Sequence, residues 1–164
     1  MVALPSNKSF ALIAEHEGYF FYSKNYDITK LQENSDGFFI DVPMQPIKGS
    51  TSFVLENIFF DVDKSILKPE SITELNKLKV FLSKNATLKV ELGGHTDSDG
   101  ADDLNLELSK KRAISVKNAL SSEFGIENSR LETDVKGEIE PVSDNNSTEG
   151  KAQNRRVEFA LIQK

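Results

Sequence analysis

The segment TLKVELGGHTDSDGADDLNLELSKKRAISVKNAL, residues 87–120, decides the fold of this chain. Its first part alternates apolar and charged residues up to two glycines, Gly93 and Gly94, which predicts a strand with one buried face. Its second part places apolar residues at helical spacing, which predicts an amphipathic helix. The apolar positions of this helix are Leu104, Leu108, Val116 and Leu120. The segment therefore predicts a strand followed directly by a helix that packs on it.

The sequence upstream predicts another strand and another helix. Apolar runs at residues 53–55 and 58–60 are rich in β-branched and aromatic residues, which favours a strand. Pro69 suits the first turn of the helix that follows. The residues expected on the buried face of that helix are Ile72, Leu75, Leu78, Phe81 and Leu82.

The sequence downstream predicts two more strands. Residues 131–135 and 157–161 alternate apolar and polar positions, and a turn-rich loop separates them at residues 141–150. The order β-α-β-α-β-loop-β requires crossover connections and some parallel pairing. We therefore expect a two-layer α+β domain over residues 51–164.

Residues 1–50 have a different character. Residues 8–22 predict a β-hairpin with its turn at residues 17–18 and the aromatic residues 19–22 in its second arm, followed by a polar loop over residues 23–37. A two-stranded hairpin buries too little surface to fold alone. We therefore expect a short β-rich extension or the tail of a preceding β-sandwich domain.

Composition excludes several classes of function. The chain has 164 residues and a net charge of −6, whereas nucleic-acid binding depends on clustered Lys and Arg. It contains no cysteine, so disulfides, thiolate metal sites and cysteine nucleophiles are excluded. It contains two histidines, too few for a multi-histidine metal centre. No stretch reaches the ~18 apolar residues of a membrane-spanning helix.

Polar residues gather where the central strand ends and its helix begins. Asp97 lies just past the strand, and Arg112 shares the four-residue spacing of Leu108 and Val116, on or beside the buried face of the helix. A buried charge needs a partner. Spacing alone leaves two interpretations open: a structural ion pair between Asp97 and Arg112, or a ligand site at the carboxyl end of a strand.

Three separated motifs resemble one known family. GHTDSDGADDLNLELSKKRAISVKNAL is preceded by NIFFDVDKSILKPES and followed by GEIEPVSDNNSTEGKAQNRRVEF. Together, over about residues 52–162, they resemble the C-terminal OmpA-like domain, a family that includes peptidoglycan-associated lipoproteins and the periplasmic domains of flagellar motor stators. The resemblance implies a β-α-β-α-β-β fold with a mixed sheet. It also implies non-covalent binding of peptidoglycan through the diaminopimelate of the stem peptide.

The same resemblance assigns roles to individual residues. By the family motif TDxxGxxxxNxxLSxxRA, Asp97 receives the ammonium group of the ligand and Arg112 grips its carboxylate. The further pocket members that it implies are Gly94, Thr96, Asn105, Asp61 and Arg155. A fixed anion beside a fixed cation is complementary to a zwitterion. The implied protein is a cofactor-free anchor, not an enzyme, which ties an outer-membrane protein to the cell wall in the Gram-negative periplasm.

Three other functions compete with wall binding. Loops starting at Asp97 and at Asp61 both lack the sixth-position glycine and twelfth-position glutamate of an EF-hand, so we expect no calcium site. His95 and Asp97 could imitate part of a metal hydrolase, but a third ligand and the common catalytic motifs are missing. The remaining alternative is a protein–protein interaction module of the envelope that uses the aromatic residues 19–22 as a contact surface.

Overall fold

The computed structural model describes residues 9–27, 40–48, 52–61 and 63–162. The chain divides into two compact units, residues 1–47 and residues 48–164. The domain boundary predicted after residue 50 lies outside the described residues, as does most of the loop predicted over residues 23–37.

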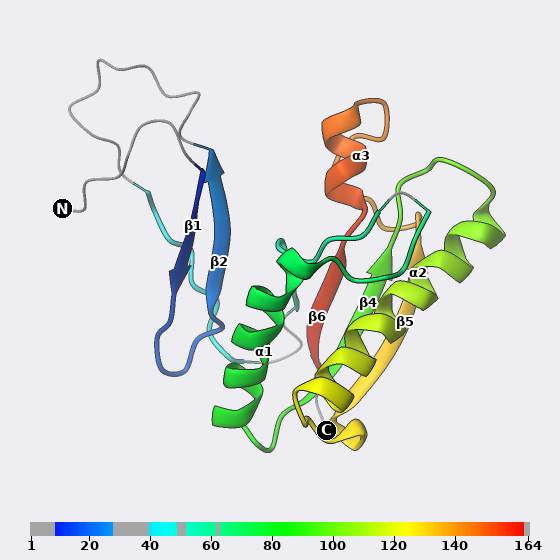
Figure 1. Ribbon diagram of the computed structural model, residues 1–164. Helices are drawn as coiled ribbons and strands as arrows, with labels where there is room; N and C mark the ends of the chain where they lie inside the picture. The colour runs from blue at the N-terminus through cyan, green and yellow to red at the C-terminus, as the bar shows by residue number, and fades with distance from the viewer. Residues whose placement is uncertain (1–8, 28–39, 49–51, 62, 163–164) are drawn as a thin grey trace, which may run out of the picture. The chain divides into compact units, whose positions relative to one another are not determined.

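The first unit contains the predicted hairpin, but its second arm lies further along the chain. β1 (Ser9–Ala14) pairs antiparallel with β2 (Tyr22–Asp27) (Figure 1). The second arm therefore begins at Tyr22, which pairs with Ala14, and continues into residues expected in a loop; its prediction for residues 19–21 is wrong. The backbone amide of Phe20 donates to the carbonyl of Gln45 (2.8 Å), so this part of the aromatic run bonds to a later segment instead of to the first arm.

The second unit is built on a four-stranded sheet in the order β3-β6-β4-β5. Its strands are β3 (Ser52–Val54), β4 (Lys89–His95), β5 (Leu131–Gly137) and β6 (Val157–Ile162). β4 and β5 run parallel, whereas β6 is antiparallel to both β3 and β4. The helices α1 (Ile72–Lys84) and α2 (Asp102–Asn118) lie on one face of this sheet (Figure 1). The predicted two-layer α+β domain with a mixed sheet is confirmed.

Apolar side chains from α1, α2 and the sheet form the core of this unit. Those that are fully buried include Leu75, Leu78, Leu82, Val90, Leu92, Val116 and Leu120. Phe159 of β6 packs against Phe81 of α1 with ring centroids 5.9 Å apart. One predicted core residue of α1 is wrong: Ile72 is exposed, and Glu74 is buried in its place. The carboxylate of Glu74 accepts a hydrogen bond from Asn57 (3.2 Å), which makes this burial possible.

The first strand of the second unit is shorter than predicted. β3 ends at Val54, and the predicted strand residues 58–60 form no regular strand; Phe60 makes one isolated bridge with Leu67. That bridge closes a turn in the chain ahead of α1. Asp61 therefore lies in a turn instead of at the end of a strand.

The buried face of α2 begins with small polar residues instead of the predicted leucines. Leu104 is 67% exposed, whereas Asn105 and Ser109 are buried. The helix approaches β4 so closely that a Cβ at Gly94 would overlap the backbone carbonyl of Ser109. Because this close approach leaves no space for a leucine, the predicted stripe is wrong at its start and correct from Val116 onward.

A third helix, α3 (Thr148–Asn154), stands where the sequence predicts a loop over residues 141–150. Its N-cap is Ser147, whose hydroxyl accepts a hydrogen bond from the amide of Gly150 (3.0 Å). Arg155 follows this helix directly instead of opening the last strand. Neither α3 nor any other helix in the described ranges is long and apolar enough to cross a membrane.

Candidate functional site

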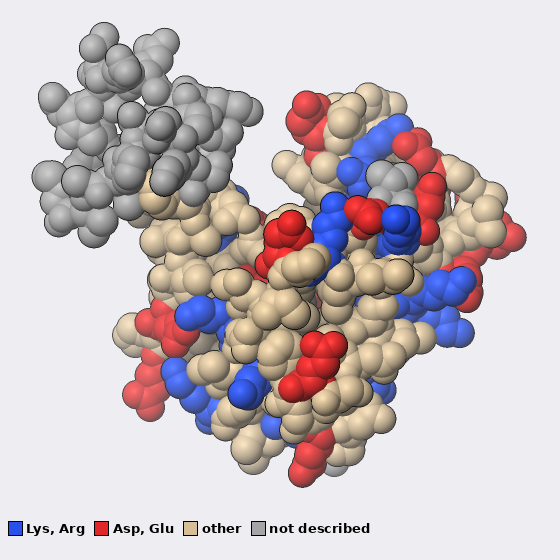
Figure 2. All heavy atoms as spheres, viewed as in Figure 1, with Lys and Arg blue, Asp and Glu red and all other residues tan. Residues whose placement is uncertain are grey.

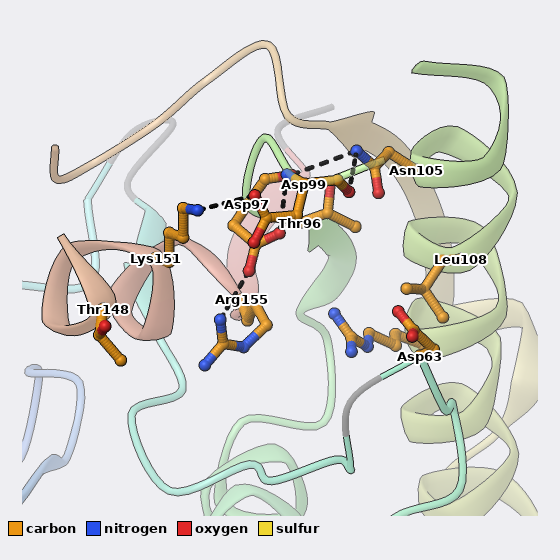
Figure 3. A pocket seen from close by; sticks show the side chains of 10 residues that line it. Asp63, Thr96, Asp97, Asp99, Asn105, Leu108, Thr148, Lys151 and Arg155 are labelled. Atoms are coloured by element: carbon orange, nitrogen blue, oxygen red, sulfur yellow. Dashed lines mark hydrogen bonds and ion pairs between the residues drawn. The ribbon is translucent and has the colours of Figure 1, made fainter. Parts of the chain in front are cut away.

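A cavity of about 350 Å³ opens between α2, α3 and the loop after β4. The loop contributes Thr96, Asp97 and Asp99 to its lining, and α2 contributes Asn105, Leu108 and Arg112. The rest of the lining comes from Asp63, Thr148, Lys151 and Arg155. In Figure 3, the side chains of α3 lie on one side of the loop residues and those of α2 on the other. The site therefore forms at the carboxyl end of β4, where ligands bind in sheets with crossover helices.

Arg112 is held deep in this site by the turn that precedes α1. Its side chain is 2% exposed, and its Nε donates to the backbone carbonyl of Lys64 (3.1 Å). Its Nη2 donates to the carbonyl of Asp61 (3.5 Å), and the guanidinium carbon lies 5.2 Å from the centroid of the Phe60 ring. The remaining nitrogen, Nη1, is buried and has no hydrogen-bond partner among the described residues. Arg112 is thus rigidly placed with one donor unused.

The surroundings of Arg112 lower the pKa of its guanidinium. Burial lowers the pKa of its guanidinium, and the nearby charge of Arg155 lowers it further, whereas Asp97 and Asp63 oppose both effects. Arginine nevertheless stays protonated in proteins. A buried, charged group with an unused donor is a strong site for a carboxylate, which a guanidinium can bond with two parallel donors.

Asp97 is paired with Arg155 and not with Arg112. One carboxylate oxygen, Oδ2, accepts from Nη1 of Arg155 (2.6 Å), and the other, Oδ1, accepts from the backbone amide of Asp99 (3.1 Å). The structural ion pair between Asp97 and Arg112, one of the two interpretations that spacing left open, is therefore not formed. Asp97 and Arg112 line the same cavity as separate charged groups.

Asn105 and Thr96 shape the cavity from its polar wall. The Nδ2 of Asn105 donates to the carbonyls of Asp97 (3.3 Å) and Asp99 (3.1 Å) and to the carboxylate of Glu138 (2.5 Å). Asn105 thereby holds the loop that carries Asp97. Thr96 is buried, its amide bonds to β5, and its hydroxyl has no partner among the described residues.

Two predicted site residues, Asp61 and Gly94, do not line the cavity. The carboxylate of Asp61 is half exposed and pairs with Lys68 (2.8 Å) and Lys64 (3.1 Å), and these lysines lower its pKa. Asp61 reaches the site through its backbone carbonyl, which bonds Arg112. Gly94 contributes by permitting the close approach of α2 to β4. Direct ligand contacts from these two residues stay predictions.

Four polar lining residues were not predicted as site residues from the sequence: Asp63, Asp99, Thr148 and Lys151. Asp63 has a φ of 55°, in the left-handed region that is uncommon for a residue other than glycine. Lys151 pairs with Asp99 (2.7 Å). Lys151 lies four residues before Arg155, a spacing that places two side chains side by side on a helix. This spacing would have predicted a shared site only if α3 had been predicted as a helix.

His95 ends β4 outside the cavity lining, as a buried structural residue. Burial, together with the charge of Arg156, lowers the pKa of His95 from its ordinary 6.5 to about 4. Among the described residues, no group of three or more histidine, aspartate and glutamate side chains is arranged to hold a metal ion. The face shown in Figure 2 intermixes acidic and basic side chains, unlike the basic patch of a nucleic-acid-binding protein.

Comparison with known proteins identifies the family. The sequence model of the OmpA family matches residues 59–155, more than half of the chain and the whole of the cavity lining. The chain belongs to the OmpA family. The resemblance that the sequence motifs predicted is therefore confirmed.

Relatives within the OmpA family are longer proteins. The chain is 45% identical over 107 residues to outer membrane protein Omp38 of Acinetobacter baumannii, covering 64% of this chain and 29% of that protein. It is 41% identical over 105 residues to the probable lipoprotein YiaD of Escherichia coli, covering 64% of this chain and 48% of that protein. The chain thus spans less than half the length of these relatives.

Solved structures of the OmpA family share the fold. The peptidoglycan-associated lipoprotein of Burkholderia pseudomallei is 28% identical with a TM-score of 0.60, covering 64% of this chain and 88% of that chain. The cell wall anchor of the T6SS from Pseudomonas aeruginosa is 27% identical with a TM-score of 0.58, covering 69% of this chain and 80% of that chain.

Proposed function

We propose that this chain binds peptidoglycan non-covalently through the diaminopimelate of the stem peptide. One observation carries the proposal. Arg112 is almost fully buried, lines the cavity and keeps a buried donor without a partner among the described residues, while Asp97 lines the same cavity. An unsatisfied buried donor costs free energy in the free protein, and a ligand carboxylate would satisfy it.

The free end of diaminopimelate carries an ammonium and a carboxylate on one carbon. Arg112 supplies a donor for the carboxylate, and the Asp97 carboxylate supplies acceptors for the ammonium. Lysine in the same position of a stem peptide keeps the ammonium and lacks the carboxylate. It would leave the buried donor of Arg112 unpaired, so the site discriminates against it.

The named relatives support an envelope role. One solved structure is a peptidoglycan-associated lipoprotein and another is a cell wall anchor. We place this chain in the periplasm of a Gram-negative cell, where it anchors an outer-membrane protein to the wall. It acts there as a binding module, without catalysis and without a cofactor.

Sedimentation with purified diaminopimelate-type sacculi tests the proposal. The variant is Arg112→Gln, which removes the charge and keeps a polar side chain. Its matched control is Arg156→Gln, because Arg156 is also a buried arginine whose Nη1 has no partner among the described residues, but it lies outside the cavity lining and pairs with Glu158 (2.6 Å). Circular dichroism establishes that both variants are folded.

We expect the wild type and Arg156→Gln to sediment with the wall and Arg112→Gln to stay in solution. Sedimentation of folded Arg112→Gln at the wild-type level would overturn the assignment of Arg112. A wild type that stays in solution would overturn wall binding altogether, and the protein–protein interaction module would replace it.

A further inference from the structure

Two ion pairs join α3 to the loop after β4. In the first, which we call the inner pair, Arg155 bonds the carboxylate of Asp97 (2.6 Å). In the second, the outer pair, Lys151 bonds the carboxylate of Asp99 (2.7 Å). The amide of Arg155 donates to the carbonyl of Lys151 (3.1 Å), so the two cations lie one helical turn apart. All four residues line the cavity, and Figure 3 shows both pairs bridging from α3 to the loop.

The carboxylates of the two pairs lie at different depths. The side chain of Asp97 is 11% exposed and that of Asp99 is 67% exposed, whereas the cations Arg155 and Lys151 are similarly exposed, at 32% and 28%. Asp97 therefore lies toward the interior of the cavity with Arg112, and Asp99 lies toward its mouth. A ligand whose zwitterionic end reaches Asp97 and Arg112 can extend past Asp99 and its partner Lys151 toward solvent.

The proposed ligand has a second charged end at a matching distance. The two amino-acid centres of diaminopimelate are separated by three methylene groups, which span about 5 Å when extended. Lys151 and Arg155 are four residues apart, which corresponds to a rise of about 6 Å along a helix. The ligand is therefore long enough for its other end to reach the level of the outer pair when one end occupies the inner site.

We infer that the outer pair is a second subsite, in which Lys151 recognises a free carboxylate at the peptide-linked end of diaminopimelate. This inference rests on the proposed function. In a stem peptide, the nitrogen of that end is acylated, so its N–H can donate to Asp99 while its carboxylate accepts from Lys151. Lys151 exchanges one carboxylate for another, and Asp99 stays solvated because it is largely exposed. No bond is made or broken in this exchange.

The subsite predicts a preference among wall peptides. A stem that ends at diaminopimelate carries the free carboxylate and satisfies Lys151. A stem in which that carboxylate is amidated, or joined to a further residue, offers Lys151 no anion, so Lys151 stays paired with Asp99. In the first kind of stem the ligand carboxylate replaces that of Asp99, which returns to water, and the ligand gains a charge-assisted hydrogen bond that an amide lacks, so the structure assigns the preference to this kind of stem.

Calorimetric titration of the full chain tests this inference. The probes are two synthetic peptides, alanyl-γ-glutamyl-diaminopimelate with the carboxylate of the acylated end free, and the same peptide with that carboxylate amidated. The variant is Lys151→Gln. The control is Lys110→Gln, because Lys110 is an exposed lysine of α2 outside the cavity lining.

We expect the wild type and Lys110→Gln to bind the free acid about threefold more tightly than the amide, because Lys151 gives up its pair with Asp99 when it bonds the ligand. Lys151→Gln should bind both peptides alike, at the affinity of the amide. Equal binding of acid and amide by the wild type would overturn the second subsite and leave the proposed function intact, as would a preference that survives in Lys151→Gln. Failure of the wild type to bind either peptide would overturn the proposed function and the subsite together.

Discussion

Arg112 and Arg130 lie at opposite ends of the α/β layer, and both donate hydrogen bonds to backbone carbonyls. Arg130, just before β5, donates to three backbone carbonyls, those of Leu82, Asn85 and Leu88, at distances of 2.9 to 3.0 Å. Arg112, at the cavity, donates to two carbonyls and has one buried nitrogen left over. Arg130 leaves no buried nitrogen without a partner among the described residues.

We interpret Arg130 as a structural arginine and propose that Arg112 is a binding one. The carbonyls that Arg130 bonds belong to the end of α1 and its connection to β4, so its guanidinium stabilises this connection; the carbonyl of Asn85 also accepts from the amide of Leu88 (3.1 Å). The guanidinium of Arg112 is also positioned by backbone carbonyls, but it lines the cavity, where the proposed ligand carboxylate would bond its remaining nitrogen. Substitutions at the two positions should therefore affect different measurements.

The largest effect is expected on binding, in Arg112→Gln. The affinity for diaminopimelate should fall about 100-fold, because the ligand carboxylate loses its charged partner in a buried site. The free energy of unfolding should change less than in Arg130→Gln, because the loss of two carbonyl bonds is partly offset by removal of a buried unpaired charge. Calorimetry and urea denaturation measure the two quantities. Wild-type affinity in the folded variant would refute the role of Arg112.

Arg130→Gln should give the reverse result. Loss of its carbonyl bonds should lower the free energy of unfolding by about 2–3 kcal/mol. The affinity for diaminopimelate should stay within about twofold of wild type, because Arg130 lies outside the cavity lining. A large loss of affinity in the folded variant would show that the two ends of the layer are not independent.

A smaller effect on binding is expected in Asn105→Ala. Asn105 donates to the carbonyls of Asp97 and Asp99 and so holds the loop whose Asp97 carboxylate we propose as the partner of the ligand ammonium. Loosening this loop should lower the affinity for diaminopimelate about tenfold. Chemical shifts of the Asp97 and Asp99 amides should move in the free variant. An unchanged affinity would show that the loop is positioned without Asn105.

An effect on stability alone is expected from pH, through His95. Its folded pKa of about 4 lies below its ordinary value of 6.5, so between these pH values the unfolded chain takes up a proton that the folded chain does not. The free energy of unfolding should therefore fall as the pH drops from about 6.5 to about 4. In His95→Gln this part of the slope should disappear. An equal slope in both proteins would contradict the burial of a neutral His95.

Local periodicity predicted the parts of the fold that bury apolar side chains. Alternation in β4 and helical spacing in α1 and α2 predicted the two-layer arrangement because burial of apolar residues governs both patterns. Burial of Leu104 was wrongly predicted because α2 approaches β4 closely at Gly94, which favours small residues on this face of the helix. The distance between a helix and a strand cannot be inferred from periodicity. α3 was missed because it is seven residues long and has no apolar stripe.

Part of the candidate site could also be predicted from the sequence. Motif resemblance identified Asp97, Arg112 and Asn105, which the structure brings to one cavity. One of the two interpretations that spacing left open paired Asp97 with Arg112, whereas the partner of Asp97 is Arg155, which lies 58 residues away in the chain. Such a pairing depends on the position of α3, which tertiary contacts determine. Lys151 was missed for the same reason.

Recognition of a carboxylate by the unused nitrogen of Arg112 is tested most directly with two stem peptides, alanyl-γ-glutamyl-diaminopimelate and alanyl-γ-glutamyl-lysine. Both end in a side-chain ammonium, but only diaminopimelate carries a carboxylate on the same carbon. We expect titration of the wild type with the diaminopimelate peptide to shift the Nη signals of Arg112 and the amide of Asp97 in NMR spectra, and the lysine peptide at the same concentration to leave them in place. Equal shifts with both peptides, or none with either, would contradict the account.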